Sequence, residues 1–217
     1  MVCRMRQCAV SFEPLNFRHD YSIELDPEFP GDGEWDCQAV GFSAEGEPLG
    51  FLESPWGIPL VLRVIPQAGN DWVLSISGGN GLTSLRGIYA TPQPDVFLAV
   101  VDGAGLFVRA TDPSSAWPLG VMVTQVYGSA LPRPILLISR GISLVAMDAD
   151  GILWQTPRLC WDDLTIERIE RNEVHCSGDF IPPAPFVLDL STGERLSGPA
   201  FIDPTRPASN AGNGSCS

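Results

Sequence analysis

Short apolar runs, each ended by glycine, proline, aspartate or asparagine, are the main pattern along this chain. The runs at 58–65, 71–77 and 121–127 are rich in β-branched and aromatic residues. Runs bounded in this way are typical of β-strands. No segment carries an apolar stripe sustained at helical spacing. The pattern therefore predicts an all-β protein.

Turn signals join the predicted strands into hairpins. Each turn lies between two apolar runs, and glycine supplies the positive φ that tight hairpin turns need. The turns are Asp102-Gly103, Asp148-Ala149-Asp150-Gly151 and Ser191-Thr192-Gly193-Glu194. Residues 162–171 have an acidic start and favour either a hairpin or a short helix; the alternation of Leu164 and Ile166 favours the hairpin.

The spacing of the turns indicates repeated units. They fall near residues 45, 102, 150 and 192, roughly 40 to 57 positions apart, which suits blades of four short strands. In 145–154 an apolar strand runs into an aspartate turn, a glycine and an apolar pair ending in Trp154. The segment 187–196 is similar, although Leu196 stands near the expected tryptophan. Both segments resemble the repeats of quinoprotein-type β-propellers, and 161–193 resembles the C-terminal part of uncharacterised bacterial all-β proteins.

We therefore expect an antiparallel meander arranged like a small β-propeller. A β-sandwich or an open barrel fits the same strand pattern and stays an alternative. Residues 1–202 are expected to form a single all-β domain, followed by a frayed tail over 203–217 that lacks apolar anchors. The N-terminal residues lack the apolar core of a signal peptide, so we expect a cytoplasmic protein.

Charge limits the partners that the chain can bind. The formal net charge is −13, and the basic residues are 13 arginines without any lysine. A strongly acidic protein repels phosphate backbones and anionic lipid, so neither nucleic acid nor a membrane is an expected partner. The ten carboxylates between Asp20 and Glu53, with no arginine among them, are the densest acidic stretch.

The missing lysine and the scarce histidine exclude several enzyme classes. A phosphate-binding P-loop, a Schiff base and a kinase-type site each need a lysine. With only His19 and His175, a zinc site of the His-Glu-x-x-His type is impossible. No cofactor is expected.

Three polar groupings could in principle hold a metal ion. Asp32, Glu34 and Asp36 alternate, as oxygen ligands of calcium often do, and Asp148 and Asp150 precede a glycine. A solvated loop and a hairpin turn explain these two groupings better. The third grouping, Cys160, His175 and Cys176 with Cys3 and Cys8, has the wrong spacing for a zinc ribbon. We predict no metal site.

Two tryptophans are the candidate binding residues. Trp56 and Trp117 stand beside prolines in predicted loops, where an aromatic ring can stack on a sugar or on a partner's surface. Trp72 and Trp154 stand in predicted strands and are expected to pack in the core.

We expect a non-catalytic β scaffold that binds a protein or a carbohydrate partner. The alternative is a glycosidase-like hydrolase that uses paired carboxylates, because acids are the abundant catalytic residue type. A third possibility is a subunit whose acidic face meets a basic partner, and its mark would be an apolar patch rimmed by acids.

Overall fold

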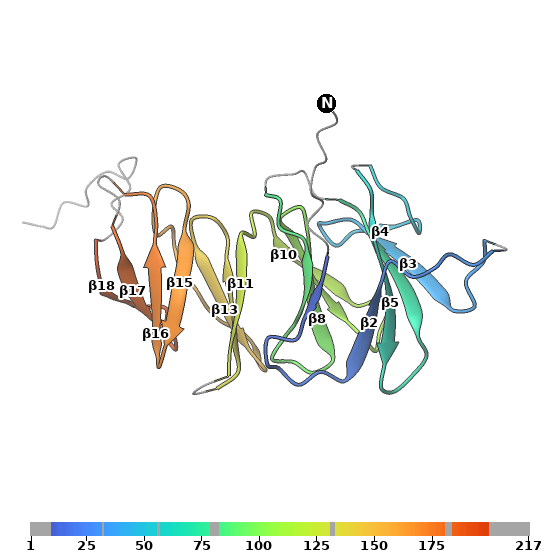
Figure 1. The fold of residues 1–217 in the computed structure, drawn as a ribbon, viewed down its shortest axis with the longest axis horizontal. Helices are drawn as coiled ribbons and strands as arrows, with labels where there is room; N and C mark the ends of the chain where they lie inside the picture. The colour runs from blue at the N-terminus through green and yellow to red at the C-terminus, as the bar shows by residue number, and fades with distance from the viewer. Residues whose placement is uncertain are drawn as a thin grey trace, which may run out of the picture.

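The structure is a computed structural model that describes residues 10–31, 33–55, 57–78, 83–130, 133–180 and 184–199. Within these ranges the chain forms strands and no helix, and the strands group into four sheets that lie side by side (Figure 1). No sheet closes into a barrel. The all-β prediction is confirmed, and the sheets lie next to one another like blades.

The four sheets are named A to D, and the strands of each follow in spatial order. Sheet B consists of β2 (Tyr21–Leu25), β5 (Leu60–Pro66), β6 (Trp72–Ile76), β3 (Gln38–Phe42) and β4 (Pro48–Leu49). Sheet A consists of β1 (Phe12–Glu13), β7 (Gly87–Ala90), β8 (Val96–Val101), β9 (Ala104–Arg109) and β10 (Ala116–Gly120). Sheet C consists of β11 (Gln125–Ser129), β12 (Ile135–Ser139), β13 (Leu144–Asp148) and β14 (Gly151–Gln155). Sheet D consists of β15 (Thr165–Glu170), β16 (Glu173–Ser177), β17 (Phe186–Asp189) and β18 (Arg195–Ser197).

The second half follows the predicted meander, and the first half departs from it. Sheets C and D place four consecutive strands in sequence order, each antiparallel to the next. In the first half, β1 pairs in parallel with β7 and β3 pairs in parallel with β6. Parallel neighbours need long connections, which is why the glycine and proline signals of local hairpins did not indicate them.

The hairpin turns form as the sequence indicates. Asp102 and Gly103 both adopt positive φ between β8 and β9. Between β13 and β14, Asp148 Oδ1 accepts a hydrogen bond of 2.9 Å from the Asp150 backbone N–H. Residues 165–177 form the hairpin β15–β16, with Arg171 at positive φ in its turn. The helical alternative for 162–171 is wrong, because the backbone from residue 165 onward is extended and pairs antiparallel with β16.

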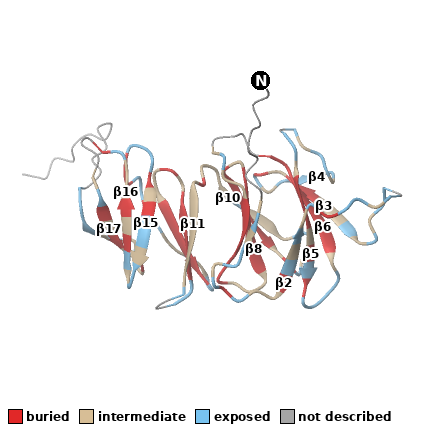
Figure 2. Cartoon of the chain, in the orientation of Figure 1, coloured by how far each residue is buried: buried red, intermediate tan, exposed pale blue. Residues whose placement is uncertain are grey.

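Three hydrophobic cores fill the spaces between the four sheets. Sheets B and A share the first core, sheets A and C the second, and sheets C and D the third. Side chains of β8 alternate, so Phe97 enters the first core and Leu98 the second. The inner strands of the two middle sheets are thus buried on both faces (Figure 2), which explains why β8, β12 and β13 are apolar throughout most of their length. Strands β16 and β17 of sheet D alternate instead.

Two tryptophans fix neighbouring sheets to each other. Trp72 of sheet B donates its Nε1–H to the carbonyl oxygen of Ala110 in the chain after β9, at 2.8 Å. Trp154 of sheet C donates to the carbonyl oxygen of Leu190 at 2.9 Å, beside the β17–β18 turn. Because a buried indole needs a partner for its N–H, each bond also sets how the two sheets meet. Trp72 is a core residue as predicted, whereas Trp154 is half-buried at the edge of the third core.

Candidate functional site

Two grooves flank β14, the edge strand of sheet C. The first lies between sheets A and C and is called the Trp117 groove; its volume is about 140 Å³. The second lies between sheets C and D, has a volume of about 430 Å³ and is called the arginine groove. Gln155, at the end of β14, lines both of them.

Trp117 lies on a strand, not in a loop. It is the second residue of β10 and pairs in register with Phe107 of β9. The prediction of a proline-flanked loop is wrong because Pro118 occupies an edge strand, where a missing N–H is tolerated. The indole stacks on the Phe107 ring at 5.7 Å between centroids with 26° between the planes, and stays half-buried. Trp117 therefore does line a groove, but it does so from a strand and not from the loop that the sequence predicted.

A bulge in β10 shapes the wall beside Trp117. Pro118 pairs with Leu106 and Gly120 pairs with Gly105, so Leu119 is the extra residue. Bulges of this kind turn edge strands and re-aim side chains. Gly120 has φ of +111°, and a Cβ at this position would lie 2.9 Å from Nη2 of Arg140. The strand therefore passes close enough to hold Arg140 against it.

Arg140 is the main polar group of the Trp117 groove. Its Nε is buried, and no described residue accepts a hydrogen bond from it. No carboxylate in the described ranges lies within ion-pair distance of its guanidinium, although six other arginines have such a partner. A buried donor without an acceptor costs roughly 1–3 kcal/mol. The Nε itself has no surface open to the groove, so an incoming carbonyl or carboxylate oxygen would meet the half-buried Arg140 through the rest of its guanidinium.

The rest of the groove is mostly apolar. Val145 and Met147 of β13 and the aliphatic chain of Leu119 line it, and Ile152 of β14 stands beside them with 65% of its surface exposed. Gln93 contributes an amide, but its Nε2 already donates to the carbonyl oxygen of Ala149 at 3.1 Å. The groove thus offers a hydrophobic surface with one cation.

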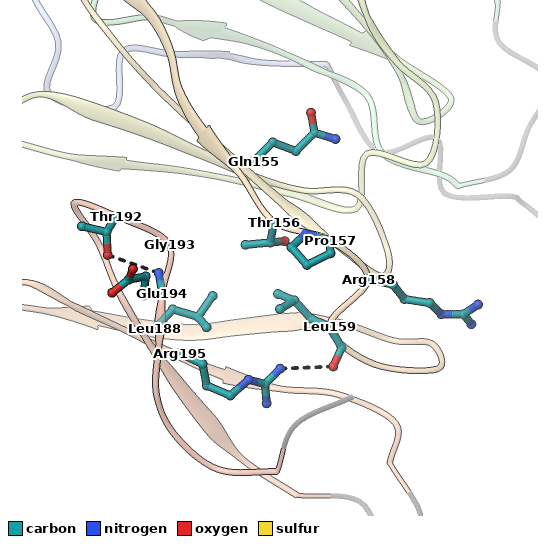
Figure 3. Close-up of a pocket in the computed structure, with 10 residues that line it drawn as sticks. All are labelled: Gln155, Thr156, Pro157, Arg158, Leu159, Leu188, Thr192, Gly193, Glu194 and Arg195. Atoms are coloured by element: carbon teal, nitrogen blue, oxygen red, sulfur yellow. Dashed lines mark hydrogen bonds between the residues drawn. The ribbon is translucent and has the colours of Figure 1, made fainter. Parts of the chain in front are cut away.

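The arginine groove is larger and carries mixed charge (Figure 3). Arg195 of β18 lies 4.4 Å from the centroid of the Phe186 ring, and its Nη2 donates to the carbonyl oxygen of Leu159 at 3.3 Å. Burial lowers the pKa of Arg195 from its usual value. Glu194 and Arg158 complete the charged lining. Arg195 thus stacks on the third core and bonds to backbone, which gives it a structural role between sheets C and D.

A third pocket, of about 530 Å³, contains two carboxylates. Asp36 and Asp71 line it, and both are ion-paired with Arg63, at 3.5 and 2.5 Å. A glycosidase keeps the space between its two carboxyls free for the sugar and a water, whereas here the guanidinium of Arg63 contacts both carboxylates.

The cysteine and histidine grouping does not assemble. Cys160 and Cys176 are buried free thiols in the third core, at 0% and 1% exposure. His175 points to the opposite face of β16, where its Nε2 lies 3.2 Å from Glu173 Oε2. Neighbouring strand residues face opposite sides, which explains the separation. Among the residues with described positions, no group of three or more histidine, cysteine or acidic side chains could hold a metal ion.

Burial makes the two core thiols resistant to ionisation. It raises the pKa of Cys176 to about 12 and also raises the pKa of Cys160. Because the folded state then holds the proton more tightly than the unfolded state, the stabilisation is complete below the ordinary thiol pKa of about 8.5 and is lost as the pH rises toward 12.

We therefore expect Cys176→Ser to reduce the alkaline sensitivity of the fold. Between about pH 8.5 and about pH 11 the free energy of unfolding of the wild type should fall, and the fall should be smaller in the variant by on the order of 2 kcal/mol. Urea titrations at each pH measure this. Equal pH slopes for both proteins would contradict the buried position of the thiol.

Some predicted positions lie outside the described residues. These are Trp56, Asp32, Cys3, Cys8 and the tail over 203–217. Within the described ranges, no helical segment has the length and apolar character that a membrane crossing requires.

Comparisons with known proteins identify no family. No family model matches the chain, and no curated protein matches it. Among solved structures, the chain is similar to AztD from Citrobacter koseri, with a TM-score of 0.41 and 12% sequence identity. The alignment covers 82% of this chain and 56% of the AztD chain, so this chain spans about half the length of that protein.

Sequence reasoning missed the residues that complete the Trp117 groove. Arg140, Gln93 and Ile152 lie in three different segments, and only the packing of sheet A on sheet C brings them together. The neighbours of Arg140 in the sequence do not distinguish it. Arg63, Arg86 and Arg133 also have no acidic residue within four positions, yet each forms an ion pair with an acid farther along the chain.

Proposed function

We propose that this protein is a non-catalytic β scaffold that binds a partner protein, and that the partner inserts an apolar side chain into the Trp117 groove. The observation that carries the proposal is the groove itself, where Trp117 and Ile152 accompany Arg140, whose buried Nε has no acceptor among the described residues. Tryptophan and arginine are the residue types that dominate binding energy at protein interfaces.

The size and lining of the groove favour a protein over a carbohydrate. Ligand pockets for small molecules are usually about 300–1,000 Å³, and this groove of about 140 Å³ has room for one side chain. A sugar needs several polar partners for its hydroxyls. Here one N–H of the Gln93 amide already donates to the Ala149 carbonyl, and most other lining residues are apolar. A side chain next to a backbone carbonyl would meet both the indole and Arg140.

The hydrolase alternative finds little support at this site. No described residue that lines the Trp117 groove is an acid, a histidine or a cysteine. The described lining of the arginine groove holds a single carboxylate, that of Glu194. Neither groove therefore supplies the two carboxylates that glycoside hydrolysis uses.

The proposal can be tested with a library of random peptides displayed on phage and selected on the full chain. We expect enrichment of peptides that share one large aliphatic or aromatic residue. Trp117→Ala should weaken the binding of synthetic versions by at least about 30-fold, since interface tryptophans contribute about 2 kcal/mol or more. Fluorescence anisotropy measures the dissociation constants.

Ile152→Asp is the second variant, because a residue that is 65% exposed can be replaced without disturbing the core. It should weaken the same peptides, whereas Ile58→Asp, at a position that is 74% exposed and outside the groove, should not. Selected peptides that bind both groove variants normally would overturn the proposal. A glycan array run in parallel distinguishes the carbohydrate alternative: binding to a glycan that Trp117→Ala abolishes, without any peptide, would also overturn it.

A further inference from the structure

Sheets D and B lie at the two ends of the molecule, and their outer faces differ in polarity and burial. Sheet D turns a polar face outward, with Glu173, His175 and Ser177 of β16 at the surface or half-buried. Sheet B does not. Its strand β6 is buried on both faces, so Val73 and Ser75 on the outer face are as inaccessible as the core residues opposite them.

The segment after β4 covers this outer face of sheet B. The Leu52 backbone N–H donates to Ser75 Oγ at 2.9 Å, and Ser54 Oγ donates to Ser77 Oγ at 3.3 Å. Gly41 lets the segment approach closely, because a Cβ there would lie 2.6 Å from the carbonyl oxygen of Gly50. The cover brings apolar side chains to the outside of the molecule.

Three aromatic rings form a cluster at this cover, which we call the aromatic patch: Phe29, Trp35 and Phe51. The centroid distances are 5.2 Å from Phe29 to Trp35, 6.2 Å from Trp35 to Phe51 and 6.4 Å from Phe29 to Phe51. Phe29 is 48% exposed, and the adjoining Leu52 is 38% exposed. The segment between β2 and β3, which carries Phe29 and Trp35, extends from the end of the molecule beyond sheet B (Figures 1 and 2).

Acidic side chains surround the patch in the sequence and lie at the surface. Glu28 precedes Phe29, Glu34 and Asp36 flank Trp35, and Glu53 follows Leu52, and all four residues are exposed. Two of these carboxylates also have partners in the chain: Asp36 pairs with Arg63 at 3.5 Å, and Glu53 accepts a hydrogen bond from the Gly50 N–H at 3.0 Å. No arginine occurs between Arg18 and Arg63. A second copy of this chain would bring the same acids and the same net charge of −13, so charge disfavours self-association at this face.

We propose that the aromatic patch binds a basic segment of a partner protein. Arginine and lysine are attracted to aromatic faces, while their aliphatic stems cover apolar surface and their charged ends reach carboxylates. The exposed ring of Phe29, the half-buried rings of Trp35 and Phe51 beside it and the acidic rim together supply all three contacts. This surface belongs to sheet B, whereas the Trp117 groove lies between sheets A and C, so the proposal does not depend on the function proposed above.

The test uses the full chain and a labelled peptide of alternating arginine and leucine, with a glutamate-leucine peptide as the negative probe. Fluorescence anisotropy at physiological salt should show binding of the basic peptide alone. Phe29→Ser with Phe51→Ser leaves the charge unchanged and should weaken binding at least about tenfold, because two cation–π and apolar contacts are lost. Phe29→Ser alone, at a largely exposed position, should weaken it about threefold and serves if the double variant is unstable.

Two charge variants separate the patch from general attraction to an acidic protein. Glu28→Gln with Glu34→Gln removes two acids next to the rings and should weaken binding about tenfold. Glu45→Gln with Glu47→Gln removes the same charge at the β3–β4 turn, where Gly46 lies against Pro118 of sheet A, and should change binding less than about twofold. Equal losses in the two charge pairs, or normal binding by the phenylalanine variants, would overturn the proposal. Trp117→Ala should leave this binding unchanged, which distinguishes it from binding at the groove.

Discussion

Replacing Trp72 by alanine is expected to remove about 3–5 kcal/mol of stability. The side chain is 1% exposed and lies in the core between sheets B and A. Its removal leaves a cavity and also leaves the Ala110 carbonyl without its 2.8 Å hydrogen bond across the two sheets. Since domains are stable by only about 5–15 kcal/mol, this is a large share of the total, and the variant should unfold at a much lower urea concentration than the wild type.

Trp72→Phe separates the two contributions. Phenylalanine keeps most of the apolar contact but cannot donate to Ala110, so its loss should be limited to about 1–2 kcal/mol. Urea denaturation followed by far-UV circular dichroism measures both variants. If alanine and phenylalanine cost the same, the hydrogen bond rather than the packing would join the sheets, which the burial of the ring argues against.

Gly193→Ala is expected to destabilise the contact between sheets C and D by about 2–4 kcal/mol. Gly193 has φ of +72°, and a Cβ would lie 2.7 Å from Cδ2 of the Trp154 ring. That ring cannot withdraw without breaking its bond to the Leu190 carbonyl. The substitution therefore strains the backbone and displaces a ring that fixes two sheets.

Two controls identify the cause of this loss. Gly57 has a similar φ of +64°, and a Cβ there would meet nothing within 4 Å, so Gly57→Ala should cost only about 1–2 kcal/mol of backbone strain. In a Trp154→Ala background, Gly193→Ala should likewise cost only the strain, so the double-mutant cycle should show coupling of at least about 1 kcal/mol. Additive effects in urea denaturation would rule out the proposed clash.

The sequence predicted the β-structure best in segments whose conformation depends only on neighbouring residues. The turns at Asp102-Gly103 and 148–151 are local, because glycine and aspartate set the backbone there without distant contacts. The hairpin at 165–177 could also be recognised, from the alternation of Leu164 and Ile166 and the turn residues after it. The parallel pairs β1–β7 and β3–β6 could not, because their partners are separated by long stretches of chain.

The candidate site was predictable only in part. Trp117 was named from its neighbours in the sequence, but it lies on a strand and gains its groove from sheet C. Arg140 could not be assigned to that groove from the sequence. It is distinguished by a buried Nε that has no hydrogen-bond acceptor among the described residues, and this depends on the tertiary structure.

By itself, the sequence determined the all-β class and the positions of the local turns. It also excluded the chemistry that needs a lysine or several histidines. These depend on residue type and on near neighbours, which the order of residues contains. The tertiary structure alone decided which sheets are buried on both faces, that Trp154 meets the turn at Gly193, and that Phe29, Trp35 and Phe51 gather into one patch. Each of these depends on contacts between distant segments, and such contacts are set by how whole sheets pack.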